Sequence, residues 1–258
     1  MSTSSAAHNA PTLPAPNTDW ALFLDFDGTL VEIAAHPDAI VVPAHLPALL
    51  RALTDTLDGA VAVISGRSLA GLDQFLDGAL PALAGVHGLE RRDGQGIVYE
   101  PIDQSASFAQ ARAALEGFVE AHPGTVLEDK GNALTLHYRG APESAAAAEA
   151  LLKHQCDVLG DEFVLQPGKQ LFELKPTSAH KGRVVETFMS EPPFAGRTPV
   201  FLGDDVTDED AFVSVNALGG HSIRIGDSQH SAARYHIDNV NEALQWLTRL
   251  ATTLPTAH

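Results

Sequence analysis

Two groups of acidic residues stand at the ends of apolar segments, where they could hold a metal ion. Asp25 and Asp27 end the first segment. Asp204, Asp205 and Asp208 follow a later one. Crowded carboxylates repel one another, and a hard divalent cation offsets the repulsion, with all-oxygen ligation favouring magnesium. A bound metal also attracts phosphate, so the pattern indicates phosphoryl transfer, in which positioning and charge neutralisation supply most of the catalysis.

The apolar segments that carry these carboxylates have the pattern of buried strands. Residues 20–26 are apolar up to Asp25 and lack polar alternation, as in a strand covered on both faces. Similar segments alternate with helical patterns at residues 60–65, 83–86, 199–202 and 222–225. This alternation predicts a doubly wound, mostly parallel, Rossmann-like α/β sheet. Because such sheets bind ligands at the carboxyl ends of their strands, we expect the acidic residues and Ser65 to converge there.

The middle of the chain has a different pattern. A hairpin is expected at 88–100, followed by helices at 107–121 and 142–159, with strand pairs at 125–129, 133–138, 163–166 and 171–174. The order helix-β-β-helix-β-β predicts a small antiparallel sheet covered by two helices, inserted as an α+β cap. The expected organisation is a disordered tail at 1–18, a catalytic core at 19–102 and 179–258, and a cap at 103–178.

The composition predicts a soluble, acidic, cytoplasmic protein. Lys and Arg total 16 and Asp and Glu total 33, for a formal net charge of −17, which disfavours nucleic acid and anionic membranes. The first residues lack a secretory signal pattern, and no apolar run approaches the roughly 20 residues that cross a bilayer. The single cysteine, Cys156, excludes an internal disulfide and is expected to be buried on a cap helix.

The motifs of the sequence, in order, resemble those of the haloacid dehalogenase superfamily. They are Asp25-Phe26-Asp27-Gly28-Thr29, Ser65, Lys181 and Asp204-Asp205 with Asp208. A closer resemblance, to the trehalose-6-phosphate phosphatase family, covers residues 20–250 and is carried by LDFDGTL, VISGRS, LAGVHGLERR, LTLHYR, Lys181-Gly182 and LGDDVTDEDAF. It implies a Mg²⁺-dependent phosphoric monoester hydrolase of carbohydrate metabolism. Its substrate would be trehalose 6-phosphate, cleaved to trehalose and phosphate in the last step of trehalose biosynthesis.

The resemblance also implies the catalytic roles. Asp25 would attack phosphorus and become an aspartyl phosphate, and Asp27 would protonate the leaving sugar oxygen and then activate water. Ser65 would hold a phosphate oxygen. Lys181, which is preferred to Lys175 because a glycine follows it at a helix start, would neutralise charge on Asp25 and the phosphoryl group.

The metal ligands implied by the resemblance are Asp25, Asp204 and the backbone carbonyl of Asp27. The sequence leaves the roles of Asp205 and Asp208 open. One of them would reach Mg²⁺ through water, and the other would orient the catalytic lysine.

Recognition of the sugar is expected in the cap. The resemblance assigns this role to Glu128, Lys130 and Glu173, with a solvated face of salt bridges as the alternative reading. Glu128 and Lys130 stand two apart in one expected strand and therefore face the same way. Arg67, His87 and Arg91 could touch the phosphate or the sugar, although structural hydrogen bonding explains them about as well.

Three alternatives to this function remain open. The substrate could be another sugar phosphate, such as sucrose phosphate or a mannosyl phosphate. The chain could be a receiver-type signalling domain, which needs only about half this length, no cap and no Asp27. It could be a non-catalytic regulatory relative, which would be expected to lack Asp25 or Asp27. Any trehalose-6-phosphate synthase partner is expected to be a separate chain.

Overall fold

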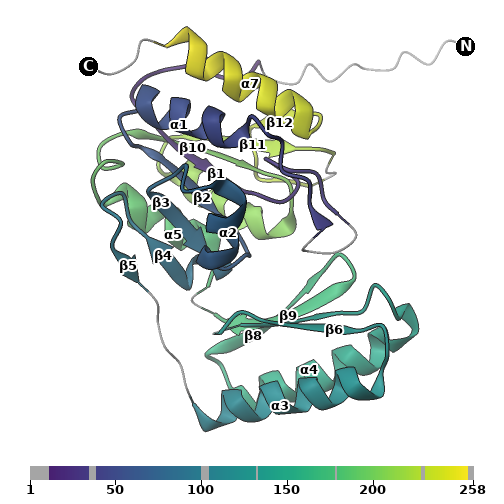
Figure 1. Cartoon of the computed structure of the whole chain (residues 1–258). Coiled ribbons are helices and arrows are strands. Elements are labelled where there is room, and N and C mark those ends of the chain that lie inside the picture. The colour runs from purple at the N-terminus through teal and green to yellow at the C-terminus, as the bar shows by residue number, and fades with distance from the viewer. Residues whose placement is uncertain are drawn as a thin grey trace, which may run out of the picture.

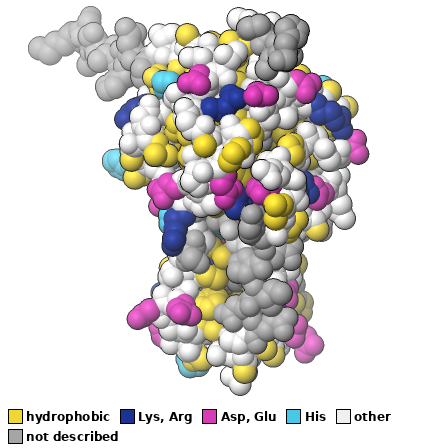
Figure 2. All heavy atoms as spheres, turned by 90° about the vertical axis from the view of Figure 1, so that its left-hand side faces the viewer, with side chains coloured by type: hydrophobic (Ala, Val, Ile, Leu, Met, Phe, Trp, Pro, Cys, Tyr) yellow, Lys and Arg dark blue, Asp and Glu magenta, His cyan; other side chains and the backbone are white. Residues whose placement is uncertain are grey.

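The computed structural model describes residues 12–34, 39–99, 105–131, 133–177, 179–227 and 230–254. Two units are visible, a large α/β core and a smaller unit of helices and strands beside it (Figure 1). In the space-filling view, the molecule is narrower where the two units meet, and acidic side chains lie on the visible face of both units (Figure 2). Among the described residues, no helix is both long enough and apolar enough to traverse a lipid bilayer.

The core contains one eight-stranded sheet. In spatial order its strands are β12 (Tyr235–Ile237), β11 (His221–Ile225), β10 (Thr198–Gly203), β1 (Trp20–Leu24), β2 (Val61–Ile64), β3 (Ala82–Gly85), β4 (Glu90–Arg92) and β5 (Val98–Tyr99). The strands from β12 to β3 run parallel, and the β4–β5 hairpin adds an antiparallel edge. The predicted fold class is confirmed. The sequence prediction missed β12, because three residues with a histidine at the centre do not form an apolar run.

Helices cover both faces of this sheet. One face carries α1 (Leu46–Thr56), α2 (Leu69–Leu76) and α7 (Val240–Thr253), and the other carries α5 (Lys181–Met189) and α6 (Glu209–Ala217). Side chains of β1 point alternately to the two faces of the sheet. Leu22 and Leu24 pack against the first group of helices, and Ala21 and Phe23 pack against the second. The strand is therefore apolar along its whole length, and the first polar side chain is that of Asp25, directly after the strand.

The smaller unit is an antiparallel sheet backed by two helices. Its strands lie in the order β6 (Val126–Asp129), β7 (Leu134–His137), β9 (Leu171–Pro176) and β8 (Phe163–Gly168), and its helices are α3 (Ala106–Ala121) and α4 (Ala145–Leu159). Leu134, Leu136 and Leu174 turn toward the helices. The opposite face of the sheet looks toward the core (Figure 1). We call this unit the cap.

The predicted domain limits fall largely outside the described residues. The cap lies within the expected range 103–178, but residues 100–104 and residue 178, where the chain would pass between cap and core, are not described. Residues 1–11 of the expected tail are not described either. The division of the chain at these points therefore stays a prediction.

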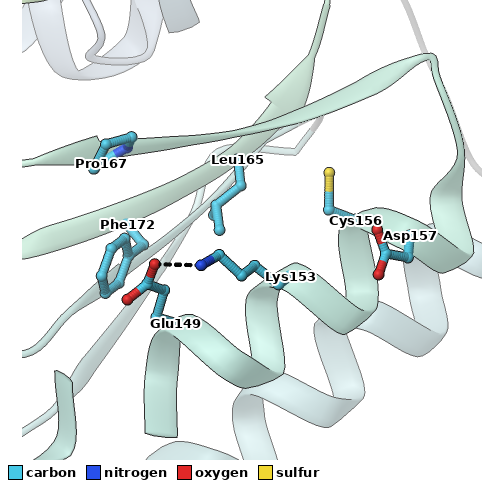
Figure 3. Close-up of a pocket in the computed structure, with 7 residues that line it drawn as sticks. All are labelled: Glu149, Lys153, Cys156, Asp157, Leu165, Pro167 and Phe172. Atoms are coloured by element: carbon cyan, nitrogen blue, oxygen red, sulfur yellow. Dashed lines mark ion pairs between the residues drawn. The ribbon is translucent and has the colours of Figure 1, made fainter. Parts of the chain in front are cut away.

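A groove of about 210 Å³ lies on the helix side of the cap, between α4 and the strands β8 and β9 (Figure 3). It is lined by apolar side chains beside an ion pair between Lys153 and Glu149, whose atoms are 2.6 Å apart. None of the predicted site residues lines it. Cys156 borders the groove and is only partly buried, so the expected full burial of this thiol was wrong.

Leu50 tests the helix-to-sheet packing of the core. It is fully buried on α1 within the cluster that also contains both tryptophans of the chain, Trp20 and Trp246. We expect Leu50→Ala to lower the free energy of unfolding by about 2–5 kcal/mol, because it leaves a cavity that the packed layers cannot close. Urea titration followed by tryptophan fluorescence measures this, with exposed Val213→Ala on α6 as the control, expected within about 0.5 kcal/mol of wild type. Equal losses in both variants would contradict this packing.

Candidate active site

The central carboxylate is Asp25, which directly follows β1. Its backbone N–H donates to the Leu202 carbonyl at 2.9 Å, so the residue is held between β1 and β10. These strands flank the point at which the chain order of the sheet reverses, where doubly wound folds place ligands. Gly28, with φ of +86°, turns the chain away after Asp27, and a Cβ at this position would lie 2.2 Å from Asp204 Oδ2. A glycine is therefore required for the loop to approach the second acidic group.

Lys181 holds Asp25 from the opposite side of the site. Its Nζ lies 2.6 Å from Asp25 Oδ1 and 2.6 Å from Asp208 Oδ1, and all three side chains are almost wholly buried. Burial alone would lower the pKa of Lys181, but Asp208 and Asp25 outweigh burial and raise it above its ordinary value. The amine is therefore a fixed positive charge. Lys175, the rival in the sequence, lies on β9 of the cap.

Asp208 anchors both this lysine and the loop that carries Asp204. Its Oδ2 accepts hydrogen bonds from the backbone N–H groups of Asp204 and Asp205, each at 2.9 Å. Its Oδ1 accepts a hydrogen bond from Lys181 Nζ. A Cβ at Gly203 would lie 2.4 Å from the Asp208 carboxyl carbon, so this close approach needs glycine. Since both oxygens of Asp208 are engaged, its place in the structure is that of a positioning group.

Asp205 has a different environment. It caps the short helix η4 (Val206–Asp208), accepting from the Val206 N–H at 2.8 Å, and its side chain is partly exposed. Of the two residues that the sequence left open, Asp208 is therefore the one that contacts the lysine.

The acidic group has the properties of a cation site. Oxygen atoms of Asp25, Asp204 and Asp208 all lie within 4.8 Å of one another. Oδ1 of Asp204 is buried without a hydrogen-bond partner among the described residues. Burial, with Asp208, raises the pKa of Asp204 to about 6, and burial also raises the pKa of Asp25 well above its ordinary value. A divalent cation would favour the charged carboxylates, so these residues fit an oxygen-liganded metal.

Arg67 binds Asp27 rather than standing free for a substrate. Its Nε donates to Oδ2 at 2.6 Å and its Nη2 to Oδ1 at 2.7 Å, a bidentate pair. The guanidinium also lies over the rings of Phe26 and Phe75, 5.6 and 5.1 Å from the centroids. The Asp27 side chain is thereby turned to Arg67. The contact of Arg67 with substrate stays a prediction.

Ser65 directly follows β2, on the same edge of the sheet as Asp25. Leu24 is paired with Val63, so Ser65 stands one residue further along its strand than Asp25 on the neighbouring one. The side chain is buried, and its Oγ accepts from the Arg67 N–H at 3.1 Å. Among the residues that the structure describes, the hydroxyl donates no hydrogen bond, and its contact with a phosphate oxygen stays a prediction.

The predicted sugar-binding residues share the face of the cap sheet that looks toward the core. Strand pairing sets Glu128 opposite Thr135, and Thr135 opposite Glu173. Glu173 Oε1 accepts from Lys130 at 2.8 Å and from Thr135 Oγ1 at 3.1 Å, and Glu128 Oε2 lies 3.0 Å from His137 Nε2. Burial favours the neutral form of Glu173, but Lys130 and His87 outweigh it and hold the pKa of Glu173 well below its ordinary value.

Among the described residues, polar contacts join the cap to the core at several points. His87 Nε2 lies 2.9 Å from Glu173 Oε2, and Lys169, at the turn between β8 and β9, reaches Asp204 Oδ2 at 3.5 Å. A third side chain of the cap, Arg139, donates to the Ala34 carbonyl at 2.9 Å. Sequence reasoning did not single out Lys169 and left His87 undecided, because no local pattern shows that residues more than 30 positions apart will meet.

Comparisons with known proteins place the chain among proteins of similar sequence and fold. The trehalose-phosphatase family model matches residues 23–241. A probable trehalose-phosphate phosphatase of Sinorhizobium fredii is 44% identical over 229 residues, covering 88% of this chain and 86% of the relative. The trehalose-6-phosphate phosphatase of Escherichia coli is 42% identical over 244 residues, covering 93% and 90%. The C-terminal domain of a Candida albicans trehalose-6-phosphate phosphatase superposes with a TM-score of 0.79 at 24% identity, covering 92% and 93%, and shares the fold. The match of the family model and the identity to these relatives show that the chain belongs to the trehalose-phosphatase family.

Proposed function

We propose that the chain hydrolyses trehalose 6-phosphate to trehalose and phosphate through an aspartyl phosphate on Asp25. The observation that carries the proposal is the buried contact of Asp25 with Lys181, placed opposite a cap face of carboxylates and a lysine. The names of the relatives at 42% and 44% identity supply the substrate. A receiver-type domain would lack the cap, and a non-catalytic relative has no reason to keep both Asp25 and Asp27.

In the first step Asp25 forms a bond to phosphorus while the bond from phosphorus to the sugar oxygen breaks. The sugar oxygen leaves with a proton from Asp27. Lys181 and the Ser65 hydroxyl neutralise and hold the oxygens of the phosphoryl group. Since both oxygens of Asp27 are bound by Arg67, Asp27 must release one of these hydrogen bonds to reach the sugar.

In the second step water attacks the phosphorus of the aspartyl phosphate. Asp27 accepts a proton from this water, the bond between phosphorus and Asp25 breaks, and phosphate leaves with the oxygen that the water supplied. Asp25 is regenerated as a carboxylate beside Lys181. Arg67 can then bind Asp27 again, which keeps the acid and base group within the site between turnovers.

Asp25 and Asp204 would hold Mg²⁺, with the backbone carbonyl of Asp27 as a third proposed ligand. When bound, the ion supplies positive charge that draws in the phosphate and stabilises the charge that develops during transfer. Asp208 would act through Lys181 and the loop, since its oxygens are already engaged. Asp205 would contribute through the helix cap that it forms.

The sugar would bind against Glu128, Lys130 and Glu173. The side chains of Lys130 and Glu173 are only 9% and 6% exposed, which argues against the alternative of a solvated face of salt bridges. Glu128 is 34% exposed and can accept hydrogen bonds from sugar hydroxyls. The substrate would be made by a separate synthase, and we keep the cytoplasm as the proposed location.

Release of phosphate from a panel of substrates tests the function. We expect trehalose 6-phosphate to be strongly preferred to sucrose 6-phosphate, glucose 6-phosphate and an aryl phosphate. Asp25→Asn should lower the rate at least ~1,000-fold, because the amide is a poor nucleophile. Asp55→Asn, an exposed change on α1, is the control and should keep the wild-type rate. Preference for another sugar phosphate would overturn the substrate, and full activity of Asp25→Asn would overturn the nucleophile.

Removal of divalent cations tests the metal site. We expect a chelator to abolish phosphate release and added Mg²⁺ to restore it. Mg²⁺ should also raise the melting temperature of the wild-type chain, since an ion that binds only the folded state stabilises it. The shift in melting temperature should disappear in Asp204→Asn, which removes one proposed ligand. Undiminished turnover in the chelator, or an equal Mg²⁺ shift in Asp204→Asn, would refute this site.

Glu128→Gln tests recognition of the sugar by the cap. We expect kcat/KM for trehalose 6-phosphate to fall roughly 10-fold while turnover of the aryl phosphate is unchanged, because a charged hydrogen-bond acceptor becomes a neutral one. Glu116→Gln, an exposed change on the helix side of the cap, is the matched control and should leave both substrates unaffected. A parallel loss on both substrates would mean that Glu128 does not bind the sugar.

A further inference from the structure

The turn after β3 has an unusual backbone. Val86 and His87 have φ of +47° and +53°, and such values are rare for residues other than glycine and least favourable for β-branched ones. The turn is held in place by Val86 N–H bonded to the Arg67 carbonyl at 2.8 Å and His87 N–H bonded to the Ser65 carbonyl at 2.9 Å. A Cβ at Gly88 would lie 2.1 Å from Val184, so the turn is packed tightly on α5. Strain of this kind persists where the surroundings fix one conformation, and it is concentrated at functional sites.

This backbone directs the His87 side chain out of the core and onto the cap. The ring is buried, and Nε2 lies 2.9 Å from Glu173 Oε2. Nδ1 is buried and lacks a hydrogen-bond partner among the described residues. Within that part of the chain, the polar contact of the ring is therefore the one between Nε2 and Glu173. The space for the ring comes from Gly66, where a Cβ would lie 2.8 Å from Nε2.

Glu173 receives hydrogen bonds from two units at once. Its Oε1 accepts from Lys130 and Thr135 of the cap, and its Oε2 faces His87 of the core. Lys175 and Lys181 are the further charges near His87. Burial lowers the pKa of His87, while Glu173 opposes this shift, so a neutral ring that donates from Nε2 satisfies the contact.

We propose that His87 is a positioning residue that fixes Glu173, and with it the sugar-binding face of the cap, relative to the phosphate site at Ser65 and Asp25. The inference rests on the proposed function and extends it by adding a residue that couples sugar recognition to the core. The connection is short: Ser65 binds the His87 backbone, and the His87 ring binds Glu173. A substrate with a sugar would depend on this connection, whereas a small phosphate ester that needs only the core would not.

Two variants of similar size separate the hydrogen bond from packing. His87→Gln keeps a donor that can reach Glu173, and His87→Met fills the space without a donor. We expect His87→Met to lower kcat/KM for trehalose 6-phosphate roughly 10- to 100-fold, and His87→Gln to recover most of that loss. Both variants should turn over p-nitrophenyl phosphate within about 2-fold of wild type. Circular dichroism and melting temperature check that both variants fold.

A double-mutant cycle completes the test. If His87 acts through Glu173, His87→Met should add little further loss in a Glu173→Ala background. Additive losses, equal losses on both substrates, or a Gln variant as impaired as the Met variant would overturn the positioning role. Wild-type enzyme that shows no preference for trehalose 6-phosphate over p-nitrophenyl phosphate would instead overturn the proposed function. Retained preference in His87→Met would overturn only the role of His87.

Discussion

The site depends on one buried ion pair network, in which Lys181 stands between Asp25 and Asp208 at 2.6 Å from each. Removing three charges from water is costly, and the cost is offset only when every charge is paired with good geometry. Asp208 meets this condition through two backbone N–H groups, which also fix the Asp204 loop. One lysine therefore sets the positions of the proposed nucleophile, Asp25, and of a proposed metal ligand, Asp204, which lie about 180 residues apart in the chain.

A second network, on the cap, follows the same physical rule. Glu173 is buried between Lys130 of the cap and His87 of the core, and it remains charged because both neighbours compensate for its loss of water. A cap that moved away from the core would break the contact of Glu173 with His87 and return both side chains to water. The closed arrangement is thus stabilised by polar contacts whose strength depends on exclusion of water.

The charge of the whole chain and the charge of the site have opposite consequences. A net charge of −17 repels an anionic substrate at long range, yet Lys169, Lys175 and Lys181 gather where the cap meets the core. Screening by salt limits the long-range repulsion to about 8–10 Å, whereas lysines beside the site would act directly on a bound phosphate. The local placement of cations therefore offsets the overall negative charge where the cap meets the core.

The sequence by itself determined the alternation of core strands and helices, the antiparallel cap and the carboxylates at strand ends. These features follow from local periodicity and from the rule that ligands bind at the carboxyl ends of strands. It also favoured Lys181 over Lys175 and placed Glu128 and Lys130 on one face of a strand. Only the tertiary structure decided that Arg67 binds Asp27, that Asp208 rather than Asp205 holds the lysine, and that β12 joins the sheet. The same holds for the contact of His87 with Glu173. These outcomes depend on distances between residues far apart in the chain. Packing within the core sets the first three, and packing of the cap against the core sets the contact of His87 with Glu173.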